Sequence, residues 1–472
     1  MSEDTQSPGV PLVQLGCEKN TIDGERILGE LNTGGYEFFT LAQGHELFDS
    51  SPNNSGKFVS FQGEVRDSID LMLVNTCAFI GPAREESINA IFDAAELKRS
   101  GAVRQLGIAG CLAQTIHDEL TDELRDDIDF FMGPGDISRA LDIIDGERPY
   151  FRPDSKSLEP GPRVLSRLSR TAYIKIAEGC DKNCSFCTIP SFKGKFLSKP
   201  SDLILDEIRA LVGVGTKEIV LVSQDTVMWG TDLQTKAGKT TGLSDLIASI
   251  QKLADSEDGF DDFRLRIHYL YPSQVTEQMI AAIFESRSVA NYFDIPIQHA
   301  SSKVLKSMNR PPNPDAIRNL VSRIRNYGEE SALRTTVMTG HPSEDDADFG
   351  ILLDFLQDVP FDRLGVFAYS PEEGTPSFAM SDRAGEEIAR ERAGAVMDQQ
   401  RKISAERLAG RVGRSFDVII DEPGIGRSEL EAPDVDGVIH IEGSDLQVGS
   451  FARVKVTGSD DHDLFGEREE EQ

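Results

Sequence analysis

The chain has 472 residues and a formal net charge of −31, with 39% hydrophobic and 27% charged residues. This composition excludes a disordered polymer, and the length allows about three domains of ~150 residues each. The six cysteines are too few for a disulfide scaffold. The acidity disfavours nucleic acid and favours a basic protein partner, although it could equally serve solubility or reflect a saline cytoplasm. We expect a cytosolic protein, because no membrane span or signal peptide is apparent.

The N-terminal region, up to residue 150, repeats one pattern three times. Apolar runs of strand length at residues 10–15, 70–74 and 105–109 lead to Cys17, Cys77 and Cys111, and helix-like stretches follow. This βα alternation predicts a parallel sheet, with the cysteines at the carboxyl ends of strands, where ligands gather. Three ordinary half-buried cysteines are the alternative. We predict a domain over residues 1–150.

A proline- and charge-rich stretch follows, and we predict a linker over residues 151–168. Helical stretches then alternate with six strand candidates, at residues 172–177, 218–223, 263–268, 292–295, 333–339 and 363–369. Six βα units in a row predict an α/β domain with a parallel, partial or complete barrel over residues 169–398. Active sites of such barrels lie at the carboxyl ends of the strands.

Three cysteines, Cys180, Cys184 and Cys187, lie close together after the first of these strands. A loop of this kind can bring three thiolates to three irons of a 4Fe-4S cube, leaving the fourth iron open for a small molecule. Zinc and a cluster of structural cysteines are the alternatives. The chain has no histidine between His117 and His268 that could complete a zinc site nearby.

The last region begins with a helix over residues 385–408, after which the apolar period changes toward two. Alternation at residues 415–420, 437–442 and 451–456 predicts a small β-barrel with an acidic tail, over residues 399–472. Residues 401–472 contain 9 Lys and Arg against 17 Asp and Glu, a net charge of 9−17=−8. This sign disfavours a general RNA-binding module.

The cysteine spacing C-x3-C-x2-C of residues 180–187 resembles the cluster loop of the radical S-adenosylmethionine (SAM) enzymes. Over nearly its whole length, the chain resembles the methylthiotransferases of that superfamily, which combine an N-terminal cluster domain, a radical SAM barrel and a C-terminal TRAM domain. The resemblance is closest to the branch that modifies ribosomal protein. Its matching segments are residues 184–191, 269–272, 294–299, 334–336, 370–376 and, most specifically, 431–437.

The resemblance implies a function and its cofactors. The family's auxiliary 4Fe-4S cluster has its matching ligands at Cys17, Cys77 and Cys111. The cluster that binds SAM has its matching ligands at Cys180, Cys184 and Cys187. The implied reaction is methylthiolation of the β-carbon of an aspartate in small-subunit ribosomal protein twelve. It uses one SAM as methyl donor and another as the source of a 5'-deoxyadenosyl radical. The implied electron donor is a low-potential flavodoxin or ferredoxin.

Two segments depart from the family pattern. Residues 192–199 carry lysines where the family usually has arginines. Residues 339–344 keep Gly340, Pro342 and Glu344 of a family pattern, but Ser343 replaces its final glycine. Gln224, Gln298 and Arg334 are candidates to bind SAM or substrate, because they lie on or after barrel strands. A turn cap for the glutamines and a salt bridge for the arginine are the alternatives.

Two other functions remain open at the level of sequence. A tRNA adenosine C2 methylthiotransferase would use the same clusters on an RNA substrate, against which the acidic C-terminal domain argues. A non-catalytic iron–sulfur protein that binds ribosomes is the alternative of a different class.

Overall fold

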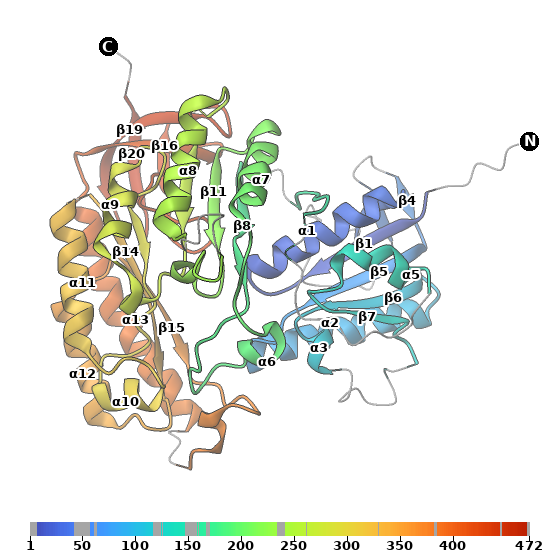
Figure 1. Cartoon of the computed structure of the whole chain (residues 1–472), viewed down its shortest axis with the longest axis horizontal. Helices are drawn as coiled ribbons and strands as arrows, with labels where there is room; N and C mark the ends of the chain where they lie inside the picture. Colours follow the sequence, from blue (N-terminus) through green and yellow to red (C-terminus); the bar gives the residue numbers. More distant parts are fainter. Residues whose placement is uncertain are drawn as a thin grey trace, which may run out of the picture. The chain divides into compact units, whose positions relative to one another are not determined.

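The computed structural model describes residues 7–41, 57–60, 64–116, 124, 126–146, 158, 160–166, 170–233, 241–260, 262–328, 330–381, 385–443 and 446–469 (Figure 1). Its contacts divide the chain into two compact units. The first comprises Met1–Leu168, Glu178–Asp181 and Cys187–Phe196, and the second comprises Ser169–Ala177, Lys182–Phe186 and Leu197–Gln472. Among the described residues, no helix has the length and apolarity needed to cross a membrane.

The first unit is built on a seven-stranded sheet of order β4-β3-β2-β1-β5-β6-β7. Its strands are β1 (Gly9–Gln14), β2 (Glu37–Leu41), β3 (Phe58–Ser60), β4 (Val65–Arg66), β5 (Ile69–Thr76), β6 (Val103–Gly110) and β7 (Phe130–Met132). The five strands from β2 to β7 in this order are parallel, as the βα alternation predicts. Strands β3 and β4 pair antiparallel at one edge, where the sequence predicts no strand.

Both faces of this sheet are buried, which is why its strands are continuous apolar runs. Leu71 and Leu73 of β5 belong to one core and Met72 and Val74 to another, because successive side chains point to opposite faces. The described α-helices of this unit are α1 (Glu18–Thr33), α2 (Gly81–Arg99), α3 (Ala113–Ile116), α5 (Ala140–Ile144) and α6 (Ile189–Lys193). Helix α1 contributes to the first core and α2 to the second.

The second unit contains six parallel strands in two sheets of consecutive order, β8-β11-β12 and β13-β14-β15. The strands are β8 (Thr171–Lys175), β11 (Glu218–Val222), β12 (Arg264–Ile267), β13 (Tyr292–Asp294), β14 (Ala332–Thr339) and β15 (Arg363–Ala368); two short strands are β9 (Ala177–Glu178) and β10 (Leu197–Ser198). An isolated bridge from Leu265 to Val289 connects β12 with the residues before β13. The predicted partial barrel is therefore confirmed.

Helices separate the barrel strands along the chain (Figure 1). They are α7 (Ser201–Gly213), α8 (Leu243–Ser256), α9 (Glu277–Glu285), α10 (Ser302–Ser307), α11 (Pro314–Tyr327), α12 (Asp346–Asp358) and α13 (Glu386–Ala409). Helix α11 shows how the sequence dictates such an element. Asn313 accepts a hydrogen bond from the Ala316 amide, Pro314 occupies the first turn, and Ile317, Leu320, Val321 and Ile324 form the buried stripe.

The C-terminal strands form a small closed β-barrel of order β16-β17-β18-β20-β19. They are β16 (Ser415–Glu422), β17 (Ile425–Arg427), β18 (Ile439–Glu442), β19 (Phe451–Ser459) and β20 (Leu464–Arg468). Its core includes Tyr292 and Ala332, the first residues of β13 and β14. The small β-barrel therefore packs against the amino ends of the parallel strands, opposite the end where the sequence predicts the active site.

Candidate functional site

The start and end of the cysteine loop belong to the first unit. Gly179 has a φ of 79°, and an added Cβ would lie 2.3 Å from the Lys195 carbonyl oxygen. Only glycine fits there. The Cys180 amide donates to the Gly194 carbonyl at 3.1 Å. These contacts fold the chain after α6 against the residues that begin the loop.

The middle of the loop, Lys182–Phe186, belongs to the second unit and is held by backbone contacts. The Ser185 amide donates to the Met308 carbonyl at 3.0 Å, and the Ser377 amide donates to the Ser185 carbonyl at 2.9 Å. Asn309 donates from Nδ2 to the Asn183 carbonyl at 2.8 Å. These contacts fix the backbone on both sides of Cys184.

The donor set of the loop fits an iron–sulfur cluster. Cys180, Cys184 and Cys187 carry thiols of intermediate exposure, and thiolates are the usual ligands of Fe–S clusters. Within the described residues, no group of three or more His, Cys, Asp or Glu side chains could hold a metal ion. Because this donor set consists of thiols, its chemistry fits an iron–sulfur cluster.

The N-terminal cysteines lie at the ends of three neighbouring strands in the first unit. Cys17 is the N-cap of α1, Cys77 follows β5 and Cys111 follows β6. Strands β1, β5 and β6 are adjacent and parallel, so these three cysteines lie together at the carboxyl ends of neighbouring strands. Gly16 has a φ of 90°, and an added Cβ there would lie 3.1 Å from the Cys77 sulfur.

A buried cation lies among these cysteines. Burial raises the pKa of Cys111 to about 12, and the nearby Lys193 opposes this shift. Lys193 is 3% exposed, and its Nζ lies 3.3 Å from carboxylate oxygens of both Asp23 and Glu178. Burial alone would lower the pKa of Lys193, but Cys111, Glu178 and Asp23 outweigh it and raise that pKa. Lys193 is thus a fixed positive charge that favours thiolate formation at Cys111.

At the carboxyl ends of the barrel strands, the cysteine loop contributes Lys182 to a polar cluster. Its Nζ lies 3.6 Å from Asp225 Oδ2, 2.9 Å from Gln274 Oε1 and 4.5 Å from the centroid of the Tyr271 ring. Burial raises the pKa of Asp225 to about 6, although Lys182 and then Arg310 oppose this shift. The mouth of the barrel thus holds charged groups in a poorly solvated setting.

Residues 339–344, which depart from the family pattern, take part in a buried network that contacts the cysteine loop. Glu344 Oε2 lies 3.1 Å from His299 Nε2, and Oε1 accepts from Arg392 at 2.6 Å. Burial and then His299 lower the pKa of His341 to about 4, with Glu344 opposing, so this imidazole is neutral near pH 7. His341 Nε2 lies 3.4 Å from Ser185 Oγ in the cysteine loop. Sequence reasoning did not single out this network.

The other predicted site residues occupy different places. Gln224 follows β11, and Gln298, with a φ of 70°, follows β13 at the carboxyl end. Arg334 lies within β14, where its guanidinium pairs with Asp294 at 3.2 Å and with Asp436 at 3.9 Å. The contact of any of these residues with SAM or substrate stays a prediction.

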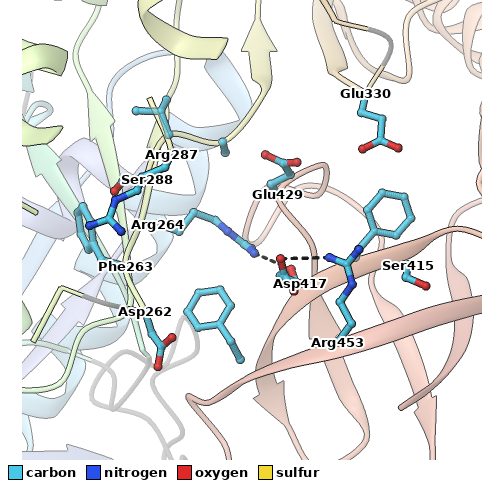
Figure 2. A pocket seen from close by; sticks show the side chains of 14 residues that line it. Asp262, Phe263, Arg264, Arg287, Ser288, Glu330, Ser415, Asp417, Glu429 and Arg453 are labelled. Atoms are coloured by element: carbon cyan, nitrogen blue, oxygen red, sulfur yellow. Dashed lines mark hydrogen bonds and ion pairs between the residues drawn. The ribbon is translucent and has the colours of Figure 1, made fainter. Parts of the chain in front are cut away.

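A cavity of ≈400 Å³ opens at the opposite end of the barrel and is lined by none of the six cysteines. Figure 2 shows Arg264 and Arg453 converging on Asp417 there. Arg264 Nη2 donates to the Asp417 carbonyl at 2.7 Å, and Arg453 Nη1 lies 3.2 Å from Asp417 Oδ2. The cavity belongs to the junction with the small β-barrel and does not mark the cysteine site.

Three family profiles match successive parts of the chain. An uncharacterized protein family, UPF0004, matches residues 60–133, the radical SAM superfamily matches residues 174–356, and the TRAM domain matches residues 412–468. The radical SAM methyltransferase TsrM of Kitasatospora setae, solved with cobalamin and a [4Fe-4S] cluster, has a similar fold. Its TM-score is 0.55 at 13% identity, covering 79% of this chain and 74% of that one. The fold and the cysteine loop define a radical SAM enzyme.

Relatives of similar length define the branch. The ribosomal protein uS12 methylthiotransferase RimO of Geobacter sulfurreducens is 38% identical over 97% of this chain and 98% of its own. RimO of Heliobacterium modesticaldum is 38% identical over 97% of this chain and 94% of its own. The chain belongs to the RimO family. It is a radical SAM methylthiotransferase, with SAM and two 4Fe-4S clusters as its cofactors.

Proposed function

We propose that this protein methylthiolates the β-carbon of an aspartate in ribosomal protein uS12. The observation that carries the proposal is the match over 97% of the chain to uS12 methylthiotransferases, which includes the acidic C-terminal domain. The target carbon has no leaving group and only a weakly acidic hydrogen, so a general base would act on it poorly. A radical suits this carbon better.

We assign Cys180, Cys184 and Cys187 to the SAM-binding cluster and Cys17, Cys77 and Cys111 to the auxiliary cluster. When bound and reduced, these groups supply a 5'-deoxyadenosyl radical from one SAM and the sulfur that a second SAM methylates. The chain's own residues orient the ligands. Lys193 places a positive charge among the N-terminal thiols, and Met308 and Ser377 fix the backbone beside Cys184.

The remaining predictions complete the proposal. We propose a cytoplasmic protein that takes electrons from a low-potential flavodoxin or ferredoxin and acts on uS12, free or in the ribosome. We divide the chain into the auxiliary-cluster domain at 1–150, a linker at 151–168, the radical SAM barrel at 169–398 and the TRAM-like domain at 399–472.

A substrate test separates this function from its tRNA-modifying alternative. The reconstituted, reduced enzyme and SAM are incubated separately with ribosomes and with tRNA, and the products are analysed by mass spectrometry. We expect one methylthio group on a uS12 aspartate and none on tRNA. Labelling of tRNA alone would contradict the proposal.

A second test addresses the two clusters. In a variant with Cys17, Cys77 and Cys111 all changed to Ala, we expect reductive cleavage of SAM to 5'-deoxyadenosine to persist, because the loop cysteines are intact. Methylthiolated uS12 should be undetectable. Undiminished methylthiolation in this variant would remove the N-terminal cysteines from the mechanism, and a wild-type protein that never cleaves SAM would support the non-catalytic alternative.

A further inference from the structure

Arg310 lies beside the middle cysteine of the loop, and nothing in the sequence argument assigns it a role. We propose that Arg310 is a positioning residue that donates a hydrogen bond from Nη1 to the cluster-bound thiolate of Cys184 and so raises the reduction potential of the radical SAM cluster. The inference rests on the proposed assignment of Cys184 as a cluster ligand.

The guanidinium of Arg310 is fixed by contacts on two sides. Nη1 lies 3.8 Å from Cys184 Sγ, Nη2 donates to the Pro296 carbonyl at 2.7 Å, and the guanidinium carbon lies 4.4 Å from the centroid of the Tyr271 ring. Arg310 is 8% exposed. A carbonyl and an aromatic ring thus hold the planar fork so that its other arm reaches the sulfur.

The backbone around Arg310 holds it against the same loop. Three consecutive residues, Met308, Asn309 and Arg310, contact residues 183–185. Asn309 adopts a φ of 56°, a left-handed conformation that asparagine tolerates better than most residues. These contacts leave Arg310 little freedom to turn away from Cys184.

The charge of Arg310 is compensated differently from that of its neighbour. Lys182, which also lies over Tyr271, has Asp225 at 3.6 Å. In the ranges that the structure describes, Arg310 forms no ion pair with an Asp or Glu side chain; its polar contacts are a carbonyl and a thiol. Asp225 interacts with Arg310 only beyond ion-pair distance. A buried cation is costly without an anion directly beside it, and a cluster thiolate provides that anion.

The expected effect on the cluster follows from electrostatics. Reduction adds negative charge to the cluster, and a hydrogen bond from a cation to a ligand sulfur stabilises the more negative state. Removing the donor should therefore make the cluster harder to reduce. Lysine retains the charge but lacks the fork that reaches both Pro296 and Cys184. Arg310→Lys therefore separates the effect of the positive charge from that of the hydrogen bond.

The test is an EPR-monitored redox titration of the holoenzyme without uS12. The radical SAM cluster is identified as the one whose EPR signal changes on adding SAM. At the wild-type midpoint potential, we expect Arg310→Met to shift the ratio of reduced to oxidised cluster about tenfold toward the oxidised form, about 59 mV for a one-electron couple. Arg310→Lys should shift this ratio less.

The matched control is Arg414→Met, which removes an exposed arginine from the other end of the barrel, where it pairs with Glu330 at 3.4 Å. The ratio should not change in this variant. Equal ratios in wild type and Arg310→Met, or equal shifts in Arg310→Met and Arg414→Met, would overturn the proposal. If Arg310→Met does not assemble the cluster, an unshifted Arg310→Lys would overturn it. Because no uS12 is present, failure of the proposed substrate would leave a measured shift standing.

Discussion

The two ends of the parallel barrel in the second unit differ in how they treat charge. At the carboxyl end, Lys182 and Arg310 lie over one tyrosine ring, and Arg310 lies 3.8 Å from the half-buried thiol of Cys184. At the amino end, buried arginines meet buried carboxylates directly. The amino end is closed by ion pairs to the small β-barrel, whereas the carboxyl end combines ion pairs, such as Lys182 with Asp225, with a cation, Arg310, beside a candidate ligand.

Glu218 is the centre of the closed end. Its side chain and that of Arg266 are both 0% exposed and lie 2.9 Å apart, and Arg427 of the small β-barrel reaches Glu218 at 2.8 Å. Burial alone would raise the pKa of Glu218, but Arg427, Arg266 and Arg264 outweigh it and lower that pKa. The carboxylate is therefore ionised in the folded protein across the neutral range.

The segment that most specifically resembles the RimO branch, residues 431–437, also lies at this end. Glu431 pairs with Arg411 at 2.7 Å. Tyr173 of β8 donates to Asp434 at 2.8 Å, and Tyr292 of β13 donates to Asp436 at 2.6 Å. Two of these three acidic side chains are thus bound by the first barrel strands of their sheets. Through these contacts the segment joins the small β-barrel to the parallel barrel.

The largest expected effect comes from the cysteine loop at the carboxyl end. Changing Cys180, Cys184 and Cys187 together to Ala should abolish 5'-deoxyadenosine formation, because SAM loses the cluster that it binds. The free energy of unfolding of the metal-free protein should change by about 1 kcal/mol or less per half-buried thiol. Chromatography of the nucleoside and thermal unfolding measure the two quantities, and persistent 5'-deoxyadenosine would contradict the assignment.

At the amino end, Glu218→Gln should instead strongly reduce the stability of the protein. Three buried arginines lose their shared counter-charge, so we expect a loss of about 3–5 kcal/mol in the free energy of unfolding. Denaturant unfolding of the metal-free protein measures this loss. The matched control is Glu386→Gln, whose partner Arg390 is 70% exposed and which should cost at most about 0.5 kcal/mol. Equal stability of the two variants would contradict the contrast between the ends.

Much of the fold can be predicted from sequence, because most strands appear as short runs rich in apolar residues between helical stretches. The predicted strand at 292–295 is observed as Tyr292–Asp294, and that at 333–339 as Ala332–Thr339. Helix α10, with six residues, and strand β4, with two, are too short for a periodic signal. Their stability comes from tertiary contacts, which the local sequence does not show.

The candidate site is less accessible to sequence. The cysteines can be found from spacing and from their positions after strands, but Arg310 lies 126 residues from Cys184 and no local pattern connects them. A residue's position on a strand also does not show which end of the barrel its side chain reaches. Arg334 pairs with Asp436, which belongs to the segment at the amino end. Lys193 was noted only as a departure from a family pattern, and its burial among cysteines is visible only in three dimensions.

Asp225 allows a pH test at the carboxyl end. Because burial raises its pKa to about 6 in the folded protein, well above the ordinary range for Asp of about 4, folding favours the protonated form. The stability that Asp225 contributes is therefore present below about pH 4 and lost as the pH rises to about 6. We expect Asp225→Asn to be more stable than wild type by about 2–3 kcal/mol at pH 7, in denaturant unfolding of the metal-free protein. A variant less stable than wild type at pH 7 would contradict this prediction.

Asp362 gives the corresponding test at the amino end, with the opposite sign and a smaller effect. Burial alone would raise the pKa of Asp362, but Arg325, Arg411 and Arg407 outweigh it and lower that pKa to about 2. The stability from this carboxylate is present above about pH 4 and lost as the pH falls toward 2, by about 2 kcal/mol. Denaturant unfolding across this range should show a steeper loss in wild type than in Asp362→Asn, which cannot titrate. Parallel profiles would mean that the arginines do not hold Asp362 ionised, and one of the ion-pair clusters that close the amino end would then be absent.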